Sequence, residues 1–231
     1  MGPPPEPDLT ALVPGCGRAY DALALARHGY AKVVAVDLSQ TACDAALEEL
    51  RSSGDPAAAK VEVLCADYFQ LDGDAHSYDL IWDCTFLCAL DPSVREQWAA
   101  QQRALLSARG TLLACVFPVC EKKGGPPYAM SVPLVRNLLE PVGFRATSTR
   151  EDLTEAESHR PGSMTAPFPG TALVAFRVDA AQSIEACTPA CTDAEHQLLT
   201  ATPGRRTPTV GLDILKPYDK SRQAIRRVPR A

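Results

Sequence analysis

Short apolar runs of strand length alternate with longer stretches of helical periodicity over the first 180 residues of the chain. The run Lys32–Asp37 holds four successive apolar residues, which is typical of a strand buried on both faces. The stretch 39–53 instead places Ala42, Ala46 and Leu50 at helical spacing. Because strand and helix patterns alternate, the sequence predicts an α/β fold with a doubly wound parallel sheet.

This pattern divides the chain into one domain, residues 1–180, and a tail, residues 181–231. The tail has no dependable apolar period, so we expect it to be disordered. The predicted strands are Ala11–Val13, Lys32–Asp37, Val61–Ala66, Tyr78–Trp82, Thr111–Phe117, Phe144–Thr149 and Ala172–Val178. The predicted helices are Ala19–His28, 39–53, a segment that begins at Asp91-Pro92 and runs to Leu106, and Ser131–Glu140.

The first two predicted strands carry the clearest sign of a ligand. Gly15 and Gly17 follow the first strand, and Asp37 ends the second. Such glycines let the backbone turn tightly and approach a ligand, and an acid at this position can accept hydrogen bonds from two ribose hydroxyls. A dinucleotide fingerprint would place a third glycine where Tyr20 stands, which favours S-adenosylmethionine over NAD. A nucleotide-binding oxidoreductase and a purely structural glycine turn stay as alternatives.

A second acid follows the third predicted strand. Asp67 and Tyr68 lie at its carboxyl end, where open α/β sheets bind ligands. Asp67 can accept a hydrogen bond from the adenine amino group while the neighbouring ring packs against the base. The structural alternative is that Asp67 caps a turn.

The charge distribution narrows the choice of partners. The tail carries eight basic and five acidic side chains, a net +3, which leaves −8 on residues 1–180 of the total −5. An acidic body argues against nucleic acid as a main partner. No apolar run reaches the roughly 18 residues of a membrane span, and Met1–Pro5 lacks the features of a signal peptide. We therefore expect a cytoplasmic monomer that acts on a small molecule.

Nine cysteines raise the question of disulfides or a metal site. Most lie inside predicted elements of a chain too large for a disulfide scaffold, so reduced thiols are expected. Cys187 and Cys191 lie near His196, but a fourth ligand is missing and the spacing is loose. We predict no metal site.

Three ordered motifs together resemble the thiopurine S-methyltransferase superfamily, and its plant and fungal thiol/halide methyltransferase branch most of all. They are Leu12-Val13-Pro14-Gly15-Cys16-Gly17, Tyr78-Asp79-Leu80-Ile81-Trp82-Asp83 with Phe86-Leu87-Cys88-Ala89-Leu90, and Gly124-Gly125-Pro126-Pro127-Tyr128. The resemblance runs from about Leu9 to Arg160. It implies a Rossmann-like class I methyltransferase sheet with a final antiparallel strand. It also implies S-adenosylmethionine as methyl donor and a small thiol, sulfide or halide as acceptor.

The resemblance also assigns residues. Cofactor binding falls to Gly15 and Gly17 in the loop, Asp37 at the ribose, Asp67 and Tyr68 at the adenine, and Asp83 with Cys84 beside the cofactor. Tyr128 and Arg160 match residues near the acceptor pocket and would orient or attract the anion. Arg95, by contrast, is expected to be a surface residue or an ion-pair partner.

Two departures from the family pattern affect these assignments. Cys84 stands where the relatives have tyrosine or arginine, so acceptor preference does not carry over. The resemblance also implies a tryptophan-rich N-terminal segment that folds over the methyl donor, and we expect this chain to lack it, because only a short stretch precedes the first predicted strand. A non-catalytic member that serves as a binding module is therefore the alternative function.

The implied reaction needs little acid–base machinery. When a sulfonium methylates a thiolate or halide, charge disappears on the way to the transition state, so water opposes the reaction. An enzyme gains by holding the anion in line with the methyl group in a dry pocket, where orientation contributes roughly 7 to 11 kcal/mol.

Overall fold

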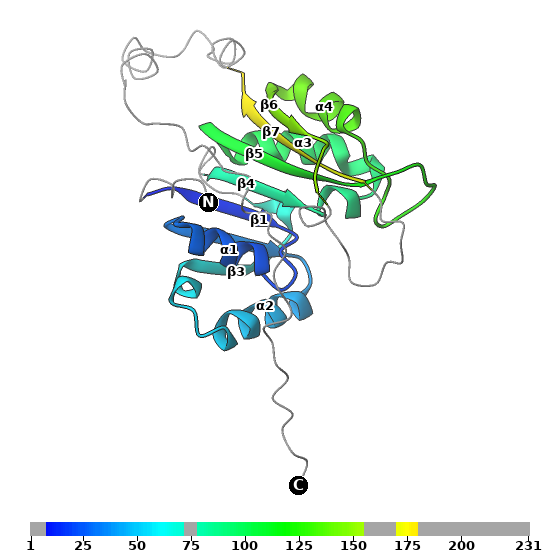
Figure 1. Cartoon of the computed structure of the whole chain (residues 1–231). Coiled ribbons are helices and arrows are strands. Elements are labelled where there is room, and N and C mark those ends of the chain that lie inside the picture. The colour runs from blue at the N-terminus through cyan, green and yellow to red at the C-terminus, as the bar shows by residue number, and fades with distance from the viewer. Residues whose placement is uncertain (1–7, 72–77, 155–169, 180–231) are drawn as a thin grey trace, which may run out of the picture.

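The computed structural model describes residues 8–71, 78–154 and 170–179, which form a seven-stranded sheet flanked by helices (Figure 1). The strand order is β3-β2-β1-β4-β5-β7-β6. Strands β1 to β5 pair in parallel, and β7 runs antiparallel between β5 and β6. The predicted fold class and the antiparallel last strand are confirmed. The bounds are Thr10–Pro14 (β1), Lys32–Asp37 (β2), Val61–Cys65 (β3), Tyr78–Cys84 (β4), Leu106–Val119 (β5), Phe144–Arg150 (β6) and Gly170–Val178 (β7).

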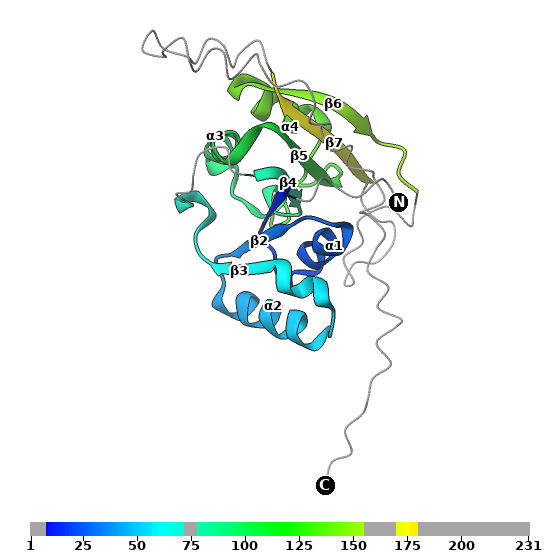
Figure 2. The same cartoon turned by 90° about the vertical axis from the view of Figure 1, so that its left-hand side faces the viewer.

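In the described part of the chain, four α-helices cover the two faces of this sheet in pairs (Figure 2). Successive strand residues point to opposite faces, so Val13 packs in the core beside α1 and α2 while Leu12 packs in the core with α3 and α4. The helices are α1 (Tyr20–His28), α2 (Gln40–Ser52), α3 (Arg95–Leu105) and α4 (Val132–Leu139), and the 3-10 turns are η1 (Pro56–Lys60), η2 (Tyr68–Gln70), η3 (Leu87–Ala89), η4 (Pro92–Val94) and η5 (Glu140–Val142).

The predicted start of the third helix and the predicted start of the strand that follows it are both wrong. Asp91 caps the 3-10 turn η4 by accepting a bond from Ser93 N at 2.9 Å, and α-helical geometry begins only at Arg95. At the other end, β5 begins at Leu106 instead of Thr111 because Leu106 pairs with Tyr78 on β4. Gly110 lies in this extension, where an added Cβ would come within 2.8 Å of the Tyr78 carbonyl oxygen.

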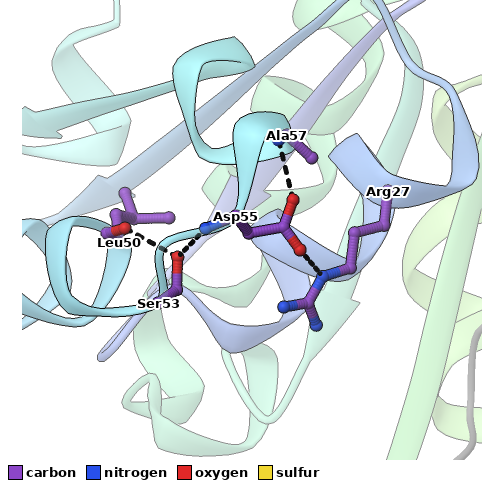
Figure 3. A network of polar contacts seen from close by, with 5 residues as sticks. All are labelled: Arg27, Leu50, Ser53, Asp55 and Ala57. Atoms are coloured by element: carbon purple, nitrogen blue, oxygen red, sulfur yellow. Dashed lines mark hydrogen bonds and ion pairs between the residues drawn. The ribbon is translucent and has the colours of Figure 1, made fainter.

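A polar network joins the end of α1 to the turn before β3, on the side of the sheet where the parallel strands begin (Figure 3). The Asp55 carboxylate accepts from Arg27 Nε at 2.6 Å and from Ala57 N at 2.8 Å. The Ser53 hydroxyl accepts from Asp55 N and donates to the Leu50 carbonyl. These backbone and guanidinium donors lower the pKa of Asp55. The opposite side, where the parallel strands end, is left open for a ligand.

Candidate active site

A cavity of about 470 Å³ opens at the carboxyl ends of β1, β2, β3 and β4. Ligands bind at this edge in open α/β sheets, and cavities of roughly 300 to 1,000 Å³ suit small molecules. Four of the predicted cofactor-binding residues line it, namely Gly15, Asp37, Asp67 and Tyr68. The other lining residues are Val36, Leu38, Ala66, Phe69, Thr85, Phe86, Ala89 and Leu90.

The loop after β1 has room for glycine alone. Gly15 has a φ of +61°, and a Cβ added there would come within 2.6 Å of Phe86 Cδ2. Phe86 therefore lies directly against the glycine loop and forms part of the cavity wall. Gly17, also at positive φ, does not line the cavity, but its N–H donates to Asp37 Oδ2 at 3.0 Å. The two glycines thus shape the loop in different ways.

Asp37 is fixed before any ligand arrives. Its Oδ2 accepts from Gly17 N at 3.0 Å, and its Oδ1 accepts from Ser39 N at 2.9 Å. A carboxylate has about four lone-pair sites, so both oxygens keep capacity for further donors. Leu38 follows and lines the same cavity with its side chain 75% exposed. A large apolar side chain left open in a cavity is suited to covering by a ligand.

The segment after β3 supplies a second acid, Asp67, and two aromatic residues, Tyr68 and Phe69, to the cavity wall. Asp67 Oδ1 accepts from Phe69 N at 2.9 Å and caps η2, so the capping alternative from the sequence is confirmed. Its Oδ2 accepts no hydrogen bond from the described residues and is available to a ligand. Tyr68 is buried, with its ring edge-on to Phe86 at 5.0 Å between centroids. Burial raises the pKa of its hydroxyl, which has no hydrogen-bond partner among the residues that the structure describes.

Asp83 and Cys84, which were expected beside the cofactor, do not line the cavity. Asp83 is buried and accepts from Leu87 N at 3.1 Å and from Trp98 Nε1 at 2.9 Å. Burial raises its pKa to about 6, although these donors act in the opposite direction. Asp83 therefore joins α3 to the turn η3, whose Ala89 lines the cavity.

The Cys84 side chain packs against the core on the α1 face, which also contains Cys115, its neighbour in register on β5. The proximity of Cys115 and burial raise the pKa of Cys84. The next residue, Thr85, has a φ of 63°, which is strained for a β-branched side chain. Such strain concentrates at functional sites, and Thr85 lines the cavity.

Tyr128, a predicted acceptor residue, does not line the cavity, but its backbone is hydrogen-bonded to the turn η3, whose Ala89 does. Its N–H donates to the Cys88 carbonyl at 2.7 Å, and its hydroxyl donates to Asp91 Oδ2 at 3.4 Å. The Arg95 guanidinium lies over the Tyr128 ring, 5.5 Å from its centroid. Arg160, the other predicted acceptor residue, lies outside the described residues.

The expectation that Arg95 is a surface residue or an ion-pair partner is wrong. Its side chain is only 8% exposed, its Nε has no hydrogen-bond partner, and no carboxylate of the described residues forms an ion pair with it. Removing a cation from water is costly unless it is paired. Arg95 is the first residue of α3, and nothing in its neighbouring residues indicates that its side chain is buried.

Within the described ranges, no group of three or more His, Cys, Asp or Glu side chains could hold a metal ion. The cysteines described there are free thiols, as expected: Cys16, Cys43, Cys65, Cys84, Cys88, Cys115 and Cys120. Cys187, Cys191 and His196 lie outside the described residues. None of the described helices is long and apolar enough to span a membrane.

Known structures share this architecture. A SAM-dependent methyltransferase from Methanosarcina mazei aligns with a TM-score of 0.62 at 18% identity, over 75% of this chain and 94% of that one. The 1,6-didemethyltoxoflavin-N1-methyltransferase of Burkholderia thailandensis, solved with S-adenosylhomocysteine, aligns with a TM-score of 0.56 at 20% identity, over 74% of this chain and 72% of that one. At such identities the likeness establishes the fold.

Curated sequences give closer matches. The chain is 41% identical over 145 residues to probable thiol methyltransferase 2 of Arabidopsis thaliana, and 37% identical over 142 residues to thiocyanate methyltransferase 1 of Brassica oleracea. Each alignment covers 62% of this chain and 61% of the relative, so the matched region is about three fifths of the relatives' length. The model of the thiopurine S-methyltransferase family matches residues 4–166. The chain belongs to the thiopurine S-methyltransferase family.

Proposed function

We propose that this chain is an S-adenosylmethionine-dependent methyltransferase that methylates a small thiol, sulfide or halide. The observation that carries the proposal is Asp37, held by two backbone N–H groups at the end of β2 and facing a cavity of about 470 Å³. The names of the plant relatives, thiol and thiocyanate methyltransferases, support the acceptor class.

The residues of the cavity fit this methyl donor. Asp37 would accept from the ribose hydroxyls, and the available oxygen of Asp67 would accept from the adenine amino group. Exposed Leu38 and the ring of Phe86 supply apolar surface for the base. Gly15 would let the backbone approach the rest of the molecule. The absence of a third glycine at Tyr20 fits a ligand without a pyrophosphate.

On the acceptor side, Arg95 and Tyr128 are the residues we assign. When bound, S-adenosylmethionine supplies a methyl group activated by a sulfonium. Arg95 carries a buried positive charge that forms no ion pair within the described residues, although the Asp91 carboxylate interacts with it electrostatically. It does not line the cavity, and we assign it the role of attracting a thiolate, thiocyanate or halide towards the site. The Arg95 guanidinium stacks on the Tyr128 ring, and the Tyr128 hydroxyl is positioned by donating to Asp91. These groups orient an anion that is already ionised, and no general base is needed.

A headspace assay tests the proposal. The full chain is incubated with S-adenosylmethionine and either hydrosulfide, thiocyanate or iodide, and the volatile methylated products are measured by gas chromatography and mass spectrometry. We expect product from at least one anion, reduced in Asp37→Ala and retained in Asp44→Ala, which removes an exposed carboxylate from the same region.

Two results would point to the alternatives. No cofactor binding at millimolar concentration would favour a non-catalytic binding module. Saturable binding of NADH in place of S-adenosylmethionine would favour an oxidoreductase.

A further inference from the structure

Two thiols lie close to the backbone of Asp37 and Leu38. Cys43 belongs to α2, and its Sγ donates to the Asp37 carbonyl at 3.5 Å. Cys65 ends β3, is paired in register with Asp37, and places its Sγ 4.0 Å from the Leu38 carbonyl. Both thiols therefore contact the backbone of the segment that presents the carboxylate to the cavity.

The two thiols also lie close to each other, because Cys43 Sγ is 3.8 Å from the carbonyl oxygen of Leu64, the residue directly before Cys65. Their surroundings differ. Cys43 is 2% exposed, whereas Cys65 is exposed to solvent. A dissolved oxidant can thus reach Cys65, and the buried partner stands ready to react with the product. Burial and the neighbouring thiol raise the pKa of Cys43 to about 11, so this second step should be the slower one.

We propose that Cys43 and Cys65 form an oxidisable dithiol whose disulfide weakens cofactor binding at Asp37. Hydrogen peroxide is a suitable oxidant. The Cys65 thiol attacks the peroxide, one oxygen is transferred to give the sulfenic acid, and one water leaves. The Cys43 sulfur then attacks the Cys65 sulfur, the S–S bond forms, and the sulfenic oxygen leaves as a second water. Two thiols lose two protons and two electrons, and the peroxide gains them.

The disulfide acts on the site through the backbone. A disulfide needs its sulfurs about 2.05 Å apart, far closer than two sulfur atoms that are not bonded to each other. Closing that gap draws the start of α2 towards the end of β3 and removes the S–H donor from the Asp37 carbonyl. The turn between them carries the Asp37 carboxylate, and a misplacement of about 1 Å can cost up to about 100-fold in a positioned site.

A peptide map tests the cross-link. The full chain is treated with peroxide and digested with trypsin plus an Asp-specific protease, because trypsin alone leaves Cys65, Cys84 and Cys88 on one peptide. We expect a linked peptide that joins Cys43 to Cys65 with the loss of two hydrogen atoms. In Cys43→Ser, which lacks the resolving thiol, Cys65 should proceed to the sulfinic acid. Linkage of Cys65 to any other cysteine, or no linkage, would overturn the proposal.

Calorimetry tests the consequence, which rests on the proposed function. Oxidation should weaken S-adenosylmethionine binding by about tenfold, and dithiothreitol should restore it. Cys65→Ser, an exposed position that is safe for folding, should abolish the effect of peroxide, and the control Cys120→Ser should keep it. Equal affinities for the reduced and the cross-linked chain would refute the effect on binding. If the reduced chain binds no cofactor, the proposed function fails, while the peptide map still decides the cross-link.

Discussion

Buried Asp83 should make the stability of this protein depend on pH in a direction that can be worked out. Burial raises its pKa from the ordinary 3.8 to about 6, and the bonds from Leu87 N and Trp98 Nε1 only partly offset this. The protonated form is therefore favoured in the folded state. Its stabilising contribution is complete below about pH 4 and is lost as pH rises through about 6. A shift of about 2 units corresponds to roughly 3 kcal/mol.

Asp83→Asn isolates this contribution because asparagine does not titrate. Urea unfolding of both proteins between about pH 4.5 and 7.5 gives two free energies of unfolding at each pH. The wild-type value minus the variant value should fall by roughly 2 kcal/mol across this range. The other carboxylates titrate in both proteins and cancel, and Asp44→Asn, an exposed site, provides the baseline. A difference that stays flat, or rises with pH, would refute the assigned role of Asp83.

Three further predictions concern the cavity and the tail. Arg95→Gln should raise the KM for anionic acceptors about 10- to 100-fold, because it removes a buried positive charge, whereas the KM for a neutral sulfide should change much less. Steady-state kinetics with both acceptor types test this, and an equal change in both KM values would contradict the assignment. Gly15→Ala should weaken S-adenosylmethionine binding and lower the free energy of unfolding by roughly 1 to 3 kcal/mol, because the added Cβ would come within 2.6 Å of Phe86 at a φ of +61°. Calorimetry measures the binding and thermal melting measures the stability; unchanged values would contradict this prediction. Deleting residues 181–231 should leave the melting temperature nearly unchanged, because no apolar period runs through them; a large fall would mean that the tail packs.

The parts of the site that depend on local sequence could be predicted. Gly15 and Asp37 follow strands that the apolar pattern marks clearly, and parallel strands bring their carboxyl ends to one edge. Asp67 could be placed there for the same reason, and its capping role followed from its position before a turn.

Side-chain direction and burial were harder to predict. The sequence shows that Asp83 ends a strand, but not that Trp98, fifteen residues later on α3, turns its indole N–H onto this carboxylate. The sequence likewise gives no sign that Arg95 is buried with its guanidinium over the Tyr128 ring. That contact joins α3 to a loop that is distant in the sequence. Leu38 could have been found, since a large apolar residue directly after the acid that is predicted to bind the ribose lies beyond the end of the strand core.

Calorimetric titration of S-adenosylmethionine into the wild-type chain and Asp37→Ala tests the central claim most directly. The account predicts saturable binding to the wild type. Each charge-assisted bond to the ribose contributes roughly 1.5 to 3 kcal/mol, so loss of two should weaken binding at least about 100-fold. Circular dichroism of the variant would establish that it is folded. Equal dissociation constants for the two proteins, or no binding to the wild type at millimolar cofactor, would contradict the account.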